Sequence, residues 1–136
     1  MRISVFQQCP RGGYVDSAGM PDPALWRQVV EDNLDDCFHM LEQAAAEGTE
    51  LAVTTETINA FGALGDARLS YPAIFEGLDG PQVKRFSEAA GKYKMHIVAG
   101  LLLTIDGNTY NCAVLFDSQG EIVGIHNQNH RLNRWF

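Results

Sequence analysis

The sequence predicts an α/β domain built on a mixed sheet, and three observations support this fold class. Apolar residues recur at helical spacing in two segments, 23–48 and 81–93, which alternate with short apolar runs. These runs have the length and composition of strands and lie at residues 2–7, 50–55, 96–105, 109–117 and 121–125. Tight turns alone separate the last three runs. The predicted order is therefore β-α-β-α-β-β-β, with helices on at least one face of the sheet.

The first strand and the first helix have recognisable boundaries. The strand at 2–7 alternates apolar and polar residues, and the glycine- and proline-rich stretch 9–22 after it is predicted to be a loop. Asp22 and Pro23 then supply an N-cap and a first-turn proline for the helix. Gly48 is a natural C-terminal stop for the same helix.

The middle of the chain contains a long irregular segment and a central strand. Residues 57–78 hold glycines and aromatic residues without a regular period, so we expect a packed loop before the helix that begins at Pro81. The strand at 96–105 is apolar on both faces, which places it in the centre of the sheet.

The last strands are predicted from turn chemistry and alternation. Asp-Gly-Asn at residues 106–108 is a strong hairpin signal, and Ser-Gln-Gly at 118–120 turns the chain again. Alternation along 109–117 places Cys112 on one face of its strand and Asn111 on the other. The hairpins imply antiparallel pairing, whereas the two helical crossovers imply right-handed, parallel pairing of the first three strands.

Composition and charge exclude several classes of function. The 136 residues are 46% apolar and 20% charged, which is ordinary for a folded domain. The formal charge of −7 opposes binding to nucleic acid or to an anionic membrane. Cys9, Cys37 and Cys112 are odd in number and widely spaced, so neither a disulfide framework nor a zinc knuckle is predicted. Because the sequence also lacks a signal-peptide pattern, we expect a cytoplasmic protein.

One acidic side chain is the leading candidate for chemistry. Glu56 directly follows the strand at 50–55, and open α/β sheets place their ligands at the carboxyl ends of parallel strands. A carboxylate there, walled by Phe61 and other loop aromatics, would be partly removed from water, which suits it to proton transfer. From position alone, a structural role at the following turn is the commoner outcome.

Four segments occur in a distinctive order along the chain. They are the strand and carboxylate at 50–57, the apolar run at 98–101, the Tyr-Asn pair in 110–115, and the Asp-x-x-Gly turn in 117–124. In this order they resemble the carbon–nitrogen hydrolase (nitrilase/amidase) superfamily, over residues 2–125. The resemblance implies the N-terminal half of an α-β-β-α sandwich, a partial nitrilase-like fold.

The resemblance also implies a Glu-Lys-Cys catalytic set, of which this chain matches one member. In the family the glutamate deprotonates a cysteine thiol, the thiolate attacks a nitrile or amide carbon, and the lysine stabilises the intermediate. Glu56 matches the general base, with Thr55 where the family usually has proline. Gln128 stands at the lysine position, and none of the three cysteines matches the nucleophile. The resemblance implies no metal and no organic cofactor.

The sequence leaves three functions open. In the first, residues 1–125 are the N-terminal part of a carbon–nitrogen hydrolase for a small amide or nitrile, cut short by truncation or a shifted reading frame before an irregular tail, 126–136, and inactive without lysine and cysteine. In the second, the half-sandwich is a non-catalytic binding module, whose uncovered face and strand edges also allow homo-oligomers. In the third, His126 and His130 share a metal, although the residues between them disfavour the helix that this spacing requires.

Overall fold

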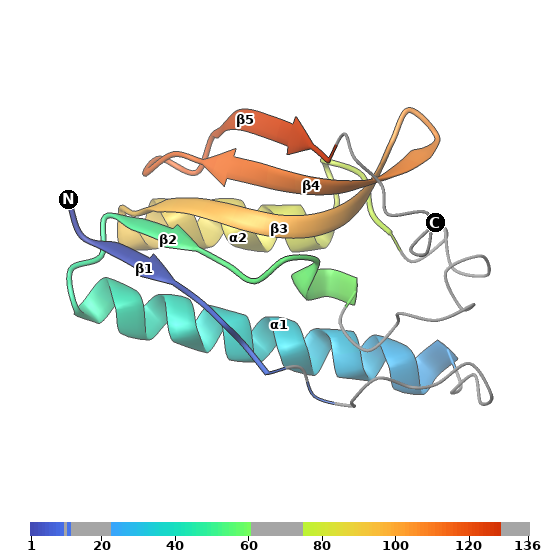
Figure 1. The fold of residues 1–136 in the computed structure, drawn as a ribbon, viewed down its shortest axis with the longest axis horizontal. Helices are drawn as coiled ribbons and strands as arrows, with labels where there is room; N and C mark the ends of the chain where they lie inside the picture. The colour runs from blue at the N-terminus through green and yellow to red at the C-terminus, as the bar shows by residue number, and fades with distance from the viewer. Residues whose placement is uncertain (10, 12–22, 61–74, 129–136) are drawn as a thin grey trace.

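The computed structural model describes residues 1–9, 11, 23–60 and 75–128, and they form a five-stranded mixed sheet with two helices (Figure 1). The elements in chain order are β1 (Ile3–Val5), α1 (Pro23–Ala46), β2 (Leu51–Val53), the short 3₁₀ helix η1 (Ile58–Ala60), α2 (Pro81–Tyr93), β3 (His96–Ile105), β4 (Asn108–Phe116) and β5 (Ile122–Asn127). Apart from η1, this is the predicted β-α-β-α-β-β-β order, and the α/β fold class is confirmed.

The strands lie in the sheet in the order in which they occur in the chain, β1-β2-β3-β4-β5. The pairs β1–β2 and β2–β3 are parallel, whereas β3–β4 and β4–β5 are antiparallel. Both helical crossovers and both hairpins therefore pair their strands as predicted. At the first hairpin, Asp106 and Gly107 both have positive φ values, 50° and 77°, as a two-residue hairpin turn requires.

The core lies on the face of the sheet that both helices cover, which we call the helix face. Phe86 of α2 contacts Phe38 of α1, with ring centroids 4.7 Å apart, and Phe116 of β4, with centroids 6.2 Å apart. Arg85 of α2 joins the two helices further, since its guanidinium bonds to Asp35 of α1 at 2.6 Å. Every second residue of β3 and β4 completes this core: Ile97, Ala99, Leu101, Leu103, Cys112, Val114 and Phe116.

The intervening strand residues form the opposite surface, which we call the open face and which includes Ile3, Val5, Leu51, Val53, Val98, Gly100, Leu102, Asn111, Ala113 and Leu115. Its outermost strand is well exposed, with 51% of Ile3 and 73% of Val5 accessible to solvent. On β3, Leu102 of this face is buried, at 5% exposed, whereas the other residues named here on β2, β3 and β4 are only partly buried. Apart from Leu102, these residues of the open face are therefore less buried than the core residues of the helix face.

The ends of the strands differ from the predictions. β1 and β2 are shorter than the runs 2–7 and 50–55, because only three residues of each pair with a neighbouring strand. β5 is longer than 121–125 and reaches Asn127, which pairs with Cys112. The expected irregular tail from residue 126 is thus wrong for its first two residues, because an edge strand tolerates polar side chains when its backbone is paired.

The β4–β5 hairpin is anchored at its turn and contains an irregularity. Ser87 Oγ of α2 donates to the Gly120 carbonyl at 2.6 Å, and Asp117 Oδ1 accepts from Gln119 N at 2.8 Å. The β4–β5 register shifts between Leu115 and Phe116, which face Gly124 and Ile122, so Val123 is an extra residue.

Within the described part of the chain, neither helix combines the length and the apolar character that crossing a membrane requires.

Candidate active site around Glu56

Glu56 stands at the end of a short segment that is tied to both neighbours of β2. Thr54 Oγ1 accepts from Gly100 N of β3 at 3.1 Å. Thr55 Oγ1 donates to the Phe6 carbonyl, just past β1, at 3.1 Å. These threonine contacts place Glu56 at the carboxyl end of the parallel strands, as the sequence predicts.

The carboxylate of Glu56 joins two amide side chains in a polar cluster. Asn111 Nδ2 donates to Glu56 Oε1 at 2.6 Å and to Gln128 Oε1 at 3.0 Å. A carboxamide nitrogen carries two hydrogens, so Asn111 can supply both bonds at once. The Gln128 backbone amide also donates to the Asn111 carbonyl, at 2.9 Å. Three segments distant in the sequence therefore converge on one point of the open face.

The surroundings of Glu56 correct one expectation. Glu56 is exposed, so the partial removal from water that we expected is not present. Phe61, which was expected to wall the carboxylate, lies outside the described residues. Instead of burial, the hydrogen bond from Asn111 holds the Glu56 carboxylate. Hydrogen bonds to a charged acceptor are stronger than those between neutral groups.

Beyond Glu56, the 3₁₀ helix η1 is held by a buried amide. Asn59 is 2% exposed, and its Oδ1 accepts from Leu102 N of β3 at 2.8 Å. Its Nδ2 donates to the Leu102 carbonyl at 2.9 Å and to Gln82 Oε1 of α2 at 3.0 Å. Because η1 is fixed to β3 and α2, the chain is held on both sides of Glu56.

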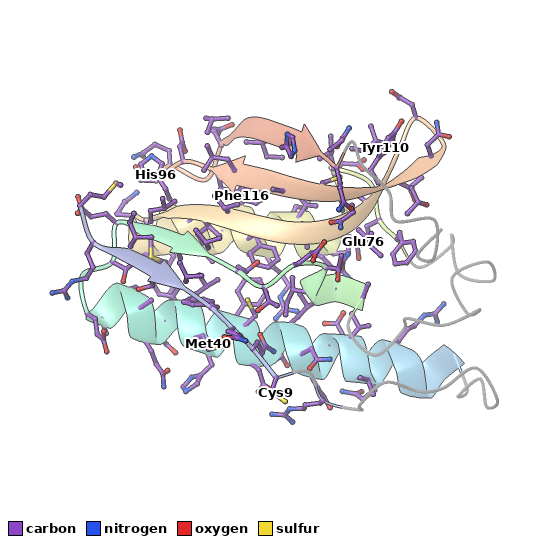
Figure 2. All side chains as sticks on the ribbon, viewed as in Figure 1. Cys9, Met40, Glu76, His96, Tyr110 and Phe116 are labelled. Carbon is purple, nitrogen blue, oxygen red and sulfur yellow. The ribbon has the colours of Figure 1, made fainter. Side chains whose placement is uncertain are left out.

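The structure keeps two of the three cysteines apart from this cluster. Cys112 points into the core because it adjoins Asn111 on the same strand, and burial raises the pKa of its thiol. Cys37 is 1% exposed in α1, and burial raises its pKa to about 12. Cys9 is exposed in the segment after β1, and Figure 2 shows it beside α1. The two buried cysteines, Cys37 and Cys112, are therefore not placed for attack on a group bound at Glu56.

No group of three or more potential metal ligands comes together among the described residues. His126 lies on β5, paired with Ala113, in extended rather than helical backbone. Its proposed partner, His130, lies outside the described residues. The strand conformation at His126 removes the helical spacing on which the metal hypothesis depended.

The sequence singles out Glu56 and Gln128 as candidates, but it assigns no role at the site to Asn111. The contact between Asn111 and Glu56 joins residues 55 apart in the sequence, which no local pattern reports. One signal was present: alternation put Asn111 on the face opposite Cys112. In the predicted sheet, a side chain on that face of the strand at 109–117 can reach the residues that follow β2.

The fold and this site define an α/β protein with a hydrogen-bonded carboxylate at a strand tip. A family profile described as carbon-nitrogen hydrolase matches residues 4–135, and the chain belongs to this family. The match includes residues 126–135, beyond the end of the resemblance noted in the sequence.

Relatives with similar sequences agree with this assignment. The chain is 35% identical over 109 residues to the bifunctional nitrilase/nitrile hydratase NIT4B of Nicotiana tabacum, covering 68% of this chain and 31% of that protein. It is 29% identical over 103 residues to nitrilase homolog 2 of Dictyostelium discoideum, covering 74% of this chain and 30% of that protein. The chain thus spans about a third of the length of these relatives.

Two solved amidases share the fold. An N-terminal amidase superposes with a TM-score of 0.71 at 15% identity, over 97% of this chain and 28% of its own. An amidase from Nesterenkonia sp. superposes with a TM-score of 0.67 at 18% identity, over 99% of this chain and 45% of its own. The nitrilase-like fold that the resemblance implied is therefore confirmed.

Proposed function

We propose that this chain is the base-bearing part of a hydrolase that acts on a carbon–nitrogen bond of a small amide or nitrile. The observation that carries the proposal is the Glu56 carboxylate, held at 2.6 Å by Asn111 at the carboxyl end of the parallel strands. Family membership supplies the reaction class, and Glu56 is the general base in this proposal.

The proposed chemistry needs a thiol from outside the residues around Glu56. A carboxylate base takes the thiol proton as the sulfur attacks the substrate carbon, and a cation then stabilises the negative charge that develops. The Asn111 amide links Gln128 to Glu56 by hydrogen bonds. The side-chain amide of Gln128 is uncharged, so it cannot supply that cation. Loss of a fixed stabilising donor typically costs about 3–4 kcal/mol of barrier. By itself, the 136-residue chain is therefore proposed to be inactive.

Two measurements on the purified chain test this proposal. Ammonia release from simple aliphatic amides and nitriles should stay at the level of a protein-free blank. Titration with the same amides, followed by ¹H–¹⁵N spectra, should shift the signals of Glu56, Asn111 and Gln128. The shifts should disappear in Glu56→Ala and persist in Glu50→Ala, which removes another exposed carboxylate.

Turnover that survives in Glu56→Ala would overturn the assignment of the base. Amide-induced shifts confined to other parts of the chain would overturn the assignment of the site.

The exposed apolar side chains of the open face support a second candidate, a non-catalytic interaction module. Ile3 and Val5 are 51% and 73% exposed on adjacent open-face positions of β1. Exposed apolar patches of this kind mark surfaces that associate. Sedimentation of the chain over a tenfold concentration range tests this function, including homo-oligomer formation, and a monomer at every concentration would contradict self-association.

A further inference from the structure

The backbone around Glu56 passes unusually close to the open face of β3. A methyl group added at Gly100 would lie 2.7 Å from the Thr55 carbonyl oxygen and 2.9 Å from the Glu56 Cα. Both contacts are with backbone atoms, which cannot rotate aside as a side chain can. The backbone of residues 55 and 56 can therefore pass this close to β3 only because residue 100 is glycine.

The residue after Glu56 has a conformation that side chains of its type rarely adopt. Thr57 has a φ of +51°, in the left-handed region. A β-branched residue is a true outlier there, and such conformations persist only where the surrounding structure enforces them. Here the close crossing at Gly100 and the fixed η1 helix lie on either side of Thr57. The backbone of Glu56 is thus held in place at an energetic cost.

The side chain of Glu56 is held from a different strand. Asn111 on β4 donates to Oε1 only, and Oε2 has no hydrogen-bond partner among the described residues. Asn111 is itself oriented, because its second hydrogen is engaged by Gln128 and its backbone carbonyl accepts from Gln128 N. Within the described part of the chain, one carboxylate oxygen is therefore fixed and the other is left without a partner.

We propose that Asn111 is the positioning residue for Glu56: it orients the carboxylate so that Oε1 is engaged and Oε2 points to the proton donor. Gln128 acts one step further out, by fixing the Asn111 amide. The inference rests on the proposed role of Glu56 as base, and it adds the residue that aims that base. Because Glu56 is exposed, a single strong hydrogen bond takes over the orienting role that a buried pocket would otherwise provide.

The test measures the orientation of Glu56 directly and needs no turnover. Three-bond scalar couplings report the χ1 rotamer of Glu56 in the labelled chain. We expect one dominant rotamer in the wild type and loss of that preference in Asn111→Ala, with couplings averaged over the staggered rotamers. The matched control is Asn108→Ala on the same strand, whose exposed amide bonds to the Asp106 carbonyl and to no other of the described residues.

A second variant separates the hydrogen bond from the bulk of the side chain. Asn111→Asp keeps the shape but replaces the donor by a carboxylate, which repels Glu56 near neutral pH. We expect the Glu56 rotamer preference to be lost in Asn111→Asp as well, while backbone amide spectra of both variants stay dispersed and folded. The couplings in Asn108→Ala should match those of the wild type.

A Glu56 that keeps its single rotamer in Asn111→Asp overturns the proposal, and so does a wild-type Glu56 that is already averaged. These results would leave the amide-binding test of the proposed function unaffected. Conversely, suppose that amides cause no shifts at Glu56 while the Asn111 variants still lose the Glu56 rotamer preference. That result would overturn the proposed function but not the positioning role of Asn111.

Discussion

Residues one position apart on the same strand play different parts on the two faces of the sheet. Cys112 is 2% exposed in the core on the helix face, whereas its neighbour Asn111 bonds to Glu56 on the open face. Likewise Ala99 and Leu101 of β3 are fully buried under the helices, while Gly100 between them lies under the backbone of Glu56. Since side chains alternate along a strand, one segment can supply stability on one side and chemistry on the other.

The largest expected effect concerns the helix face. Phe86→Ala removes a fully buried ring that contacts Phe38 and Phe116, and it should lower the free energy of unfolding by about 3–5 kcal/mol. Val5→Ala on the open face, where the side chain is 73% exposed, should change it by less than about 0.5 kcal/mol. Urea denaturation of both variants measures the difference. Equal losses would show that the two faces do not differ energetically as their burial indicates.

An intermediate effect is expected where the open face is closely packed. Gly100→Ala introduces a methyl group 2.7 Å from the Thr55 carbonyl oxygen, so it should destabilise the fold by about 1–3 kcal/mol and displace Glu56. In Gly124→Ala on β5 the methyl group would meet Leu115 at an ordinary 3.7 Å. Thermal unfolding should therefore separate the two alanine variants. A Gly100→Ala protein as stable as Gly124→Ala would argue against the close crossing.

The smallest expected effect concerns one partly buried carboxylate, Glu76. Burial raises the pKa of Glu76 above its ordinary 4.5, and the negative charge of Glu31 raises it further. A hydrogen bond from Gln82 N lowers this pKa but does not cancel the rise. Because the folded state holds the proton more tightly, the stabilisation from protonated Glu76 is complete below pH 4.5 and is lost as the pH rises through the folded-state pKa. Glu76→Gln should remove this decline, and urea titrations at several pH values measure it. An unchanged pH dependence in Glu76→Gln would contradict the role of burial.

Local sequence patterns predicted the elements of this fold but not where its strands end. Helical spacing, the Asp-Gly turn and the alternation in 109–117 depend on neighbouring residues, so both helices, both hairpins and the faces of Cys112 and Asn111 were predicted correctly. The ends of β1 and β5 depend instead on which residues find a partner across the sheet. For that reason the pairing of Asn127 with Cys112 was missed.

The candidate site shows the same division. Glu56 could be proposed as the base because its position follows from a strand boundary and from a family resemblance. Its partner Asn111 and the close crossing at Gly100 are tertiary contacts between segments more than 40 residues apart, and they became visible only in the folded chain. The exposure of Glu56 was predicted wrongly because the expected wall depended on Phe61, in a long segment that has no regular period.

The extra residue Val123, together with the turn anchored on Ser87, sets which side chain of β5 arrives opposite Asn111. Insertion of a single residue in this hairpin would bring Asn127 opposite Asn111 and turn Gln128 toward the helix face. Insertions and deletions at this turn would therefore alter the chemistry of the protein while leaving its architecture intact.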